Sequence, residues 1–291
     1  MAREGVKVLV TGAGGQLGRA LRARAPAGVT VTGLTSAELD IADAAAVALR
    51  LTAERPALVL NAAAYTAVDR AEGEPERAAA VNDHGVRNLV AAAEAVGARV
   101  AHVSTDFVFD GEAGGGYATD APTAPLGVYG TTKRAGEAHL RVQDLCVRTA
   151  WVYAAQGQNF VRTMLRLMAE REEIGVVADQ IGSPTSADDL ADALWGLAVG
   201  GERGVYHFTN SGVASWYDFA IAIRDEGVAA GLLAESAARV RPIATTDYPT
   251  PARRPAFSVL DTRATTVALG APARHWRYAL RDTLEQIQRD G

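Results

Sequence analysis

Cysteine and lysine are scarce in this sequence of 291 residues. Cys146 is the only cysteine, so no disulfide forms within the chain, and its apolar neighbours indicate a buried strand position rather than a nucleophile. Arginine supplies nearly all of the 29 basic residues, and the only lysines are Lys7 and Lys133. A lysine at position 133 therefore calls for a chemical reason.

Long apolar runs and an excess of positive charge are also missing. No stretch approaches the roughly 20 apolar residues of a membrane-spanning helix, and a net charge of -5 offers no basic field for a nucleic acid. The first ten residues lead into a predicted strand without the features of a signal peptide, so we expect a cytoplasmic protein. The five histidines lack metal-ligand spacing, so we predict no metal site.

Short apolar strands alternate with alanine-rich helices through the first half of the chain. This alternation predicts an α/β fold with a Rossmann-like, doubly wound parallel sheet. The predicted strands are Val6–Val10, Val29–Thr32, Leu58–Leu60, Val100–Ser104 and Leu145–Thr149, and the helices include Glu76–Val96 and Thr131–Arg141.

The alternation loosens after Thr149, which predicts a smaller, partly interleaved C-terminal substrate lobe. We expect residues 1–150 to form a dinucleotide-binding domain and residues 151–291 to form mainly the substrate-binding lobe. Residues 171–200 should return to the first domain, because Gly175–Val177 has the pattern of a sheet strand. Further predicted elements are helices at Phe160–Arg171 and Ser186–Val199 and a strand at Val205–Thr209.

A glycine-rich turn between the first strand and the first helix predicts a dinucleotide site. Gly12, Gly15 and Gly18 allow a tight turn and close approach to a pyrophosphate, and the helix start at Gln16 and Leu17 supplies N–H donors. A purely structural turn is the alternative. The three-and-three glycine spacing resembles that of extended short-chain reductases and sugar-nucleotide epimerases.

That resemblance implies further cofactor contacts. Asp40 and Ile41 would touch the adenine, and Asn61, Ala62, Ala63 and Ala64 would touch the middle of the cofactor, although either segment alone could be an ordinary turn. Thr35 and Ser36 stand where an acidic residue would bind the ribose of NAD and an arginine would favour NADP. Two hydroxyls without a carboxylate favour NADPH, with NADH also accepted.

Tyr129 and Lys133 carry the predicted chemistry. Their spacing of four places them on one helical face, where a nearby ammonium can stabilise a phenolate and also hold the cofactor ribose. Thr105 and Asp106 end a predicted strand, where ligands of such sheets bind, and Thr105 is the candidate hydroxyl that orients a carbonyl. Asn82 fixes its helix or a proton-relay water. A surface tyrosine with a solvated lysine is the alternative.

Seven segments together closely resemble the dTDP-4-dehydrorhamnose reductases, a family of extended short-chain dehydrogenases. The resemblance implies NAD(P)H-dependent reduction of the C4 ketone of dTDP-6-deoxy-L-lyxo-4-hexulose to dTDP-L-rhamnose, with Tyr129 as the acid, Thr105 as a hydrogen-bond donor and Lys133 as the cation that tunes Tyr129. The segments are Gly12–Gly18, Ala62–Asp69, Ser104–Asp106, Tyr129–Lys133, Arg148–Tyr153, Gln180–Thr185 and Pro249–Pro255.

The same resemblance implies that Trp151 packs beside the nucleotide base or sugar and that Arg254 lies near the diphosphate. Trp151 could instead belong to the core, and Arg254 could be a solvated loop charge.

Phe107 departs from the family's Ser-Thr-Asp-Tyr pattern, which leaves open the alternative of a sister 4-ketoreductase that acts on another dTDP-4-keto-6-deoxyhexose. A cofactor-binding regulatory subunit is the alternative without catalysis. The expected partner is a small nucleotide sugar, and a homodimer is compatible with the sequence.

Overall fold

Six parallel strands form the centre of the molecule. The computed structural model describes residues 5–290, and its main sheet has the order β2-β1-β3-β4-β5-β10, with every neighbouring pair parallel. The strands are β1 (Val6–Thr11), β2 (Val29–Leu34), β3 (Leu58–Asn61), β4 (Arg99–Thr105), β5 (Leu145–Thr149) and β10 (Gly204–His207). The strand order reverses between β1 and β3, which is where doubly wound sheets open a crevice for ligands.

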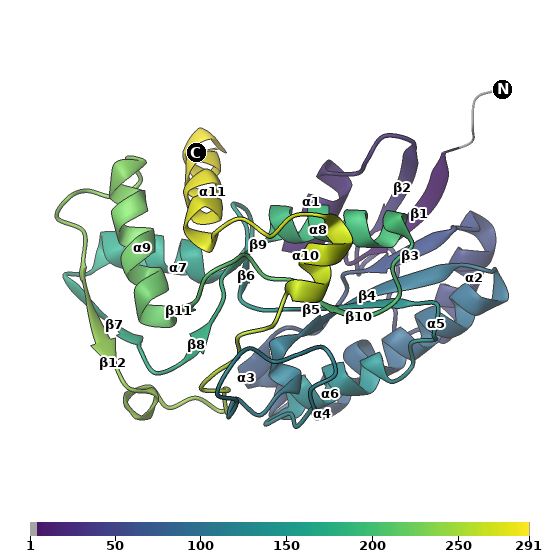
Figure 1. Cartoon of the computed structure of the whole chain (residues 1–291), viewed down its shortest axis with the longest axis horizontal. Helices are drawn as coiled ribbons and strands as arrows, with labels where there is room; N and C mark the ends of the chain where they lie inside the picture. Colours follow the sequence, from purple (N-terminus) through teal and green to yellow (C-terminus); the bar gives the residue numbers. More distant parts are fainter. Residues whose placement is uncertain (1–4, 291) are drawn as a thin grey trace.

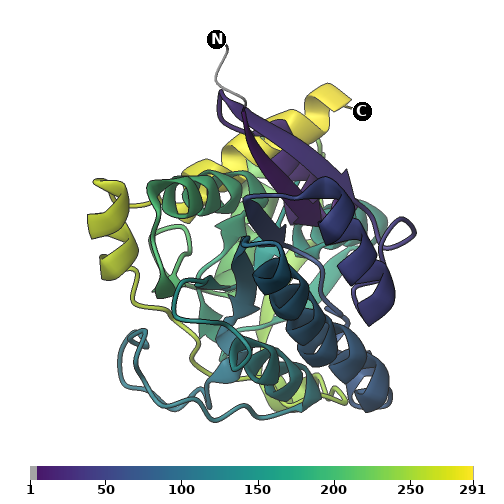
Figure 2. The same cartoon turned by 90° about the vertical axis from the view of Figure 1, so that its right-hand side faces the viewer.

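Helices cover both faces of this sheet (Figures 1 and 2). One face packs against α1 (Gln16–Ala23) and α8 (Ala187–Gly200), and the other packs against α2 (Ala44–Glu54), α5 (Gly85–Ala95) and α6 (Val128–Glu137). Side chains alternate along each strand, so Val8 and Val10 enter the first layer while Leu9 enters the second. The predicted doubly wound α/β fold is confirmed.

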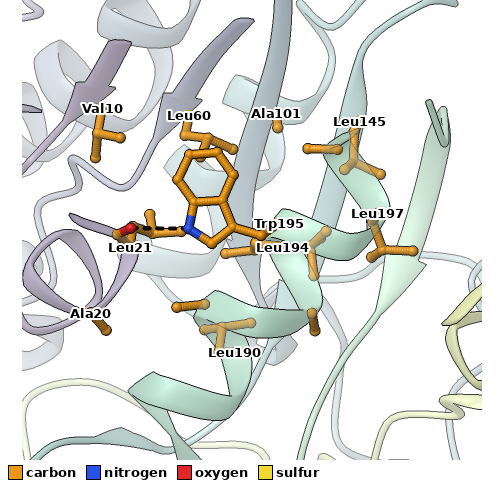
Figure 3. Packing of buried hydrophobic residues seen from close by; sticks show 14 of the residues in the cluster. Val10, Ala20, Leu21, Leu60, Ala101, Leu145, Leu190, Leu194, Trp195 and Leu197 are labelled. Atoms are coloured by element: carbon orange, nitrogen blue, oxygen red, sulfur yellow. Dashed lines mark hydrogen bonds between the residues drawn. The ribbon is translucent and has the colours of Figure 1, made fainter. Parts of the chain in front are cut away.

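Trp195 joins the two helices of the first layer (Figure 3). Its side chain on α8 is 4% exposed, and its indole Nε1 donates a hydrogen bond of 2.9 Å to the carbonyl oxygen of Leu21 in α1. That carbonyl lies in the last turn of α1, where helix carbonyls lack intrahelical donors. The indole therefore both fills the layer and satisfies the end of the helix that follows the glycine-rich turn.

A second lobe lies beside the carboxyl ends of the main strands, at the left of Figure 1. It has its own apolar core, formed by α7 (Phe160–Glu170), α9 (Trp216–Ala229) and α11 (Trp276–Asp290) against the parallel pair β7 (Glu173–Val177) and β12 (Arg239–Ile243). The short pairs β6 (Val152–Tyr153) with β9 (Thr185–Ser186) and β8 (Ile181–Gly182) with β11 (Ala214–Ser215) lie along its connections, and α10 (Arg263–Leu269) packs on α8.

The prediction that Gly175–Val177 belongs to the main sheet is wrong. This segment is part of β7, and its partner is β12 from more than sixty residues later in the chain. The strand that returns to the main sheet is β10, which adds beside β5. Sequence patterning identified both strands, but the choice of partner depends on which apolar layer receives them, and α7 and α9 cover β7.

The predicted helix Glu76–Val96 is interrupted by a π-helical turn. Its parts are α4 (Pro75–Ala79), the π-turn η1 (Ala80–His84) and α5, with α3 (Val68–Ala71) before them. Asn82 in the π-turn is fully buried, and its side chain bonds both the N–H and the carbonyl of Tyr65 and the hydroxyl of Thr132. A π-helical turn contains one residue more than an α-helical turn, and here the wider turn points Asn82 inward. The Asn82 side chain therefore connects η1 with α6. Two 3-10 turns, η2 (Asp106–Val108) and η3 (Thr245–Asp247), complete the elements.

Within residues 5–290, every helix is too short or too polar to span a bilayer.

We expect Trp195→Ala to lower the free energy of unfolding by about 3–5 kcal/mol, because it empties a packed layer. Trp195→Phe should cost less, about 1–2 kcal/mol, since it chiefly removes the bond to the Leu21 carbonyl. Urea denaturation measures both values. Leu49→Ala on α2 is the control, because Leu49 is 74% exposed and its loss should change stability by no more than about 0.5 kcal/mol. Equal effects at positions 195 and 49 would contradict this account.

Candidate active site

A cleft of about 750 Å³ lies at the carboxyl ends of β1, β3, β4 and β5. Both lobes line it: Gly14–Leu17, Ala62, Ala64 and residues 103–107 come from the first lobe, while Trp151, Trp216 and Arg254 come from segments that lead into or form the second. Tyr129 and Lys133 enter it from α6. The structure thus brings together the three predicted catalytic residues, Thr105, Tyr129 and Lys133.

The glycine-rich turn forms the floor at one end of this cleft. Gly12 has a φ of +67° and lies so close to the segment after β3 that a β-carbon there would come within 2.6 Å of the Ala63 nitrogen. Gly18 packs as closely against the Gly12 carbonyl. No side chain caps the start of α1 after Gly15, so its N–H groups are free to bind an anion. This geometry fits the pyrophosphate of a dinucleotide.

A loop that leads into the second lobe covers this turn. Asn159, the N-cap of α7, donates a hydrogen bond of 2.8 Å to Gln16 Oε1, and Gln156, Gly157 and Gln158 line the cleft. A ligand on the turn would therefore touch both lobes. Gln16 was predicted as a cofactor contact, whereas residues 156–158 carry no sequence signal, because only the return of the loop after β6 places them here.

Some of the residues predicted to touch the adenine and the middle of the cofactor lie outside the cleft lining. Asp40 accepts a hydrogen bond from the Ala42 N–H, Ile41 is buried in the α2–α5 layer, and the Asn61 side chain is turned into the protein. Thr35 donates its N–H and its hydroxyl to Glu38, each at 2.8 Å, and these bonds hold the pKa of Glu38 below its usual range.

The sequence prediction that no acidic group lies near Thr35 and Ser36 is therefore incomplete. Glu38 reaches back to the end of β2, and the Arg22 side chain lies over Gly33, where a β-carbon would come within 2.6 Å of its Cδ. A carboxylate and a guanidinium thus flank this end of the site. The sequence contains a signal for this contact, because Glu38 follows Thr35 by three residues, and side chains at that spacing commonly bond back to a turn.

Tyr129 is held as a neutral phenol. The surrounding protein removes water from its hydroxyl and raises its pKa to about 12, while the nearby Thr105 hydroxyl opposes that rise. The edge of the Phe107 ring packs on Tyr129, with ring centroids 5.5 Å apart. A phenol with this pKa keeps its proton at neutral pH, so Tyr129 holds a proton that it can donate once its anion is stabilised.

Lys133 is almost fully buried, at 2% exposure, and burial lowers its pKa to about 8. Its Nζ donates a hydrogen bond of 2.6 Å to the Val103 carbonyl oxygen and lies 3.3 Å from His102 Nε2. The expected lowering of the Tyr129 pKa by Lys133 is not found in this structure, where the contacts of Lys133 are with β4. A buried lysine without a carboxylate partner is costly, so a surface role for Lys133 is excluded.

Three buried oxygen atoms at the carboxyl ends of β4 and β5 lack hydrogen-bond partners among residues 5–290. They are Ser104 Oγ, Asp106 Oδ2 and Thr149 Oγ1, and all three residues line the cleft. Thr105 Oγ1 donates to the other Asp106 oxygen at 3.0 Å. Burial raises the Asp106 pKa to about 6 despite the hydroxyls of Ser258 and Thr105. Native proteins rarely bury unpaired polar atoms, so these three fit the hydroxyls or amide of a ligand.

Trp151 and Trp216 form an aromatic wall of the cleft. Their rings stack with centroids 3.5 Å apart and planes at 6°. Trp151 has a φ of +50°, which is rare for a bulky residue, and Gly182 makes room for its indole, since a β-carbon at position 182 would lie 2.6 Å from Trp151 Cε2. Trp216 was missed from the sequence, because nothing in its helix pattern separates it from a core residue.

Arg254 joins the two lobes at the other end of the cleft. Its guanidinium pairs with both oxygens of Asp69 in α3, at 2.8 and 3.0 Å, and also bonds the carbonyl of Ala252 at 3.2 Å and the hydroxyl of Thr250. The pairing holds the Asp69 pKa below its usual range. The alternative of a solvated loop charge is excluded, although Arg254 remains open to the cleft on one side.

Comparison with known proteins shows the family of this chain. The RmlD substrate binding domain model matches residues 6–289. The chain belongs to the RmlD substrate binding domain family.

Members of this family resemble the chain along its whole length. It is 47% identical to the dTDP-4-dehydrorhamnose reductase of Streptomyces griseus, covering 96% of this chain and 93% of that protein, and 44% identical to the reductase of Aggregatibacter actinomycetemcomitans, covering 95% and 97%. A crystal structure of the dTDP-4-dehydrorhamnose reductase of Bacillus anthracis in complex with NADP has a TM-score of 0.91 and 35% identity, covering 97% of this chain and 99% of that one.

The spacing of the histidines predicts no metal site. Residues 5–290 contain no group of three or more His, Cys, Asp or Glu side chains arranged to hold a metal ion.

We expect Gly182→Ala to displace Trp151, because the new methyl group would overlap the indole. The stacked pair should lose its exciton band in the far-ultraviolet circular dichroism spectrum, and overpacking should cost about 1–3 kcal/mol. Gly114→Ala is the matched control, since no atom lies within 4 Å of a β-carbon at that position. An unchanged exciton band in Gly182→Ala would show that Trp151 does not depend on Gly182.

We expect Asp106→Asn to stabilise the protein more at pH 8 than at pH 5. The folded-state pKa of about 6 lies above the ordinary value of 3.8, so charging Asp106 destabilises the fold as pH rises through 6. At pH 8 the gain should approach about 3 kcal/mol, because one pKa unit is worth about 1.4 kcal/mol. Urea denaturation at both pH values measures it, with Asn at the exposed Asp120 as the control. A gain independent of pH would contradict the assigned shift.

Proposed function

We propose that this protein reduces the C4 ketone of dTDP-6-deoxy-L-lyxo-4-hexulose, using NADPH or NADH, and produces dTDP-L-rhamnose. The observation that carries the proposal is the meeting of Thr105, Tyr129 and Lys133 in one cleft with the open glycine-rich turn. The dTDP-4-dehydrorhamnose reductases among its relatives support the substrate, and the NADP complex of the Bacillus anthracis protein supports the cofactor.

The residues of the cleft divide the work of such a reduction. The nicotinamide supplies the hydride to C4 when the cofactor is bound. Tyr129 gives its proton to the carbonyl oxygen as that oxygen gains charge, and the Thr105 hydroxyl donates a hydrogen bond to the same oxygen. Lys133 would hold the cofactor ribose and favour the phenolate that Tyr129 leaves behind. Trp151, Asp106 and Arg254 would bind the base or sugar, the sugar hydroxyls and the diphosphate, respectively.

The lobes would share the two ligands. Residues 1–150, with α8 packed on their sheet, would form the dinucleotide-binding domain, and residues 151–291 would supply mainly the substrate contacts. The lining of the cleft by both lobes supports this division. Because both ligands are small, soluble anions, we place the reaction in the cytoplasm, which cell fractionation can test.

A sister 4-ketoreductase is the second candidate. Phe107 packs its ring on Tyr129 inside the cleft and offers no hydroxyl to a sugar, whereas the family pattern has tyrosine there. A regulatory subunit without catalysis is less well supported, because Thr105, Tyr129 and Lys133 all line the cleft. Incubation with the dTDP-4-keto-6-deoxysugar and each cofactor, followed by analysis of the product sugar, separates these possibilities. No loss of reduced nicotinamide absorbance would reject an enzymatic role.

We expect Tyr129→Phe to lower kcat by about 10²–10⁴-fold, because a positioned general acid contributes that much. Cofactor affinity should change little, since the ring and its packing on Phe107 remain. Steady-state kinetics and cofactor titration by fluorescence measure the two effects separately. Phe107→Leu is the comparison variant, because it removes the edge contact but leaves the acid. Wild-type turnover in Tyr129→Phe would reject Tyr129 as the proton donor.

A further inference from the structure

A row of polar side chains crosses the main sheet behind Lys133. Thr11, Asn61 and His102 are register partners on the adjacent strands β1, β3 and β4, and all three are at most 1% exposed. Their neighbours along each strand, such as Leu9 and Val59, are apolar core residues. Burying three polar groups in such a layer is costly unless each is hydrogen-bonded. The row ends at Lys133, whose Nζ lies 3.3 Å from His102 Nε2.

The hydrogen bonds of this row run in one direction. The Ala63 N–H, which can only donate, points at Asn61 Oδ1 at 3.2 Å, and the Thr11 hydroxyl donates to the same oxygen at 2.6 Å. The orientation of the amide is therefore decided by its backbone partner. Its nitrogen, Nδ2, lies 3.0 Å from His102 Nδ1, so Nδ1 must accept.

The acceptor role of Nδ1 decides the tautomer of His102. Full burial and the nearby Lys133 lower the His102 pKa well below its ordinary value, so the ring is neutral and carries a single proton. Because Nδ1 accepts from Asn61, that proton must be on Nε2. The Nε2–H group faces Lys133 Nζ, which in turn donates to the Val103 carbonyl at 2.6 Å. An N–H donor held at this position disfavours the ammonium form of Lys133, which has only donors. It favours the neutral amine, whose lone pair can accept the hydrogen bond.

We propose that His102 is a positioning residue for the reaction, and that the chain from Thr11 through Asn61 and His102 holds an N–H donor against Lys133 so that Lys133 readily releases its proton. The inference rests on the proposed function. After Tyr129 gives its proton to the substrate oxygen, Lys133 can pass a proton toward the phenolate, and the His102 N–H then bonds the amine. Lys133 regains its proton from solvent before the next turnover.

The other charged and titratable groups around Lys133 do not replace this role. Glu137, one turn later on α6, is paired with Arg148 through two bonds of 2.7 and 2.8 Å. Cys146 on β5 is His102's partner in register, and burial raises its thiol pKa, so it stays neutral. Tyr129 and Asp106 face the cleft side, and burial raises the pKa of both. His102 is thus the titratable side chain that lies within hydrogen-bonding distance of Lys133 Nζ.

The scarcity of lysine makes a direct measurement practical. Protein labelled with carbon-13 at the lysine ε-carbons gives two side-chain signals, from buried Lys133 and exposed Lys7. A pH titration of the Lys133 shift follows its protonation without any substrate or cofactor. The titration therefore tests the role of His102 even if the protein does not catalyse the proposed reaction. The product assay, in turn, tests the proposed reaction even if His102 has no effect on Lys133.

Two variants remove the fixed donor in different ways. His102→Gln offers an amide oxygen that can accept from the ammonium. Asn61→Asp keeps the shape of the side chain but accepts from His102 Nδ1, which moves the ring proton and turns Nε2 into an acceptor. Each variant should raise the titration midpoint of Lys133 by about one pH unit or more, and the alkaline limb of the kcat/KM profile should move upward with it in His102→Gln.

His207→Gln is the matched control. His207 is another fully buried histidine of the same sheet, on β10, and its ring faces the Tyr117 carbonyl and Arg148 rather than Lys133. It should lose stability without moving the Lys133 midpoint. If His102→Gln and Asn61→Asp lower the melting temperature but leave the Lys133 midpoint unchanged or lower, His102 is only a structural residue and the inference is overturned. If one variant does not fold, the other decides.

Discussion

The parallel direction of β1, β3, β4 and β5 is the constraint on which the cleft depends. Parallel strands end at the same edge, so the glycine-rich turn after β1 and the hydroxyl and carboxyl groups of Thr105 and Asp106 after β4 meet there. α6 crosses the same edge and adds Tyr129 and Lys133. Antiparallel pairing of any of these strands would send its functional end to the opposite side of the sheet.

Burial then gives these groups their acid and base properties. The same loss of water raises the pKa of Tyr129 and Asp106 and lowers that of Lys133 and His102, because burial always disfavours the charged form. Tyr129 is therefore a protonated acid, and Lys133, one turn later on α6, gives up its proton more easily than usual. In a site built only from oppositely charged pairs, the pKa values of the acids would be lowered and those of the bases raised.

Contacts across the cleft connect this chemistry with the second lobe. Arg254 bonds Asp69, Asn159 bonds Gln16, and Gly182 accommodates the Trp151 indole. The stacked Trp151 and Trp216 rings and the paired Arg254 guanidinium are held in place before any ligand arrives, which reduces the ordering cost of binding. The lobes are thus joined at the points where the proposed nucleotide sugar would lie.

The sequence by itself determined three features of the protein, because each depends only on residues that are near one another in the chain. They are the order of strands and helices, the glycine-rich turn, and the spacing of Tyr129 and Lys133. Local spacing decides the helical face and the turn, and apolar patterning decides which segments are strands. The resemblance to a reductase family rests on the same short segments. The parallel sheet confirms the predicted fold, and the family match confirms the resemblance.

Only the tertiary structure decided which distant groups meet. The tertiary structure decided the pairing of β7 with β12, the bond between Arg254 and Asp69, and the packing of Trp216 on Trp151, because all three depend on how layers fit together in three dimensions. The direction of the hydrogen bonds from Thr11 to Lys133 depends on the register of three strands. Register and layer packing are set by contacts between residues far apart in the chain, so no local pattern could have shown them.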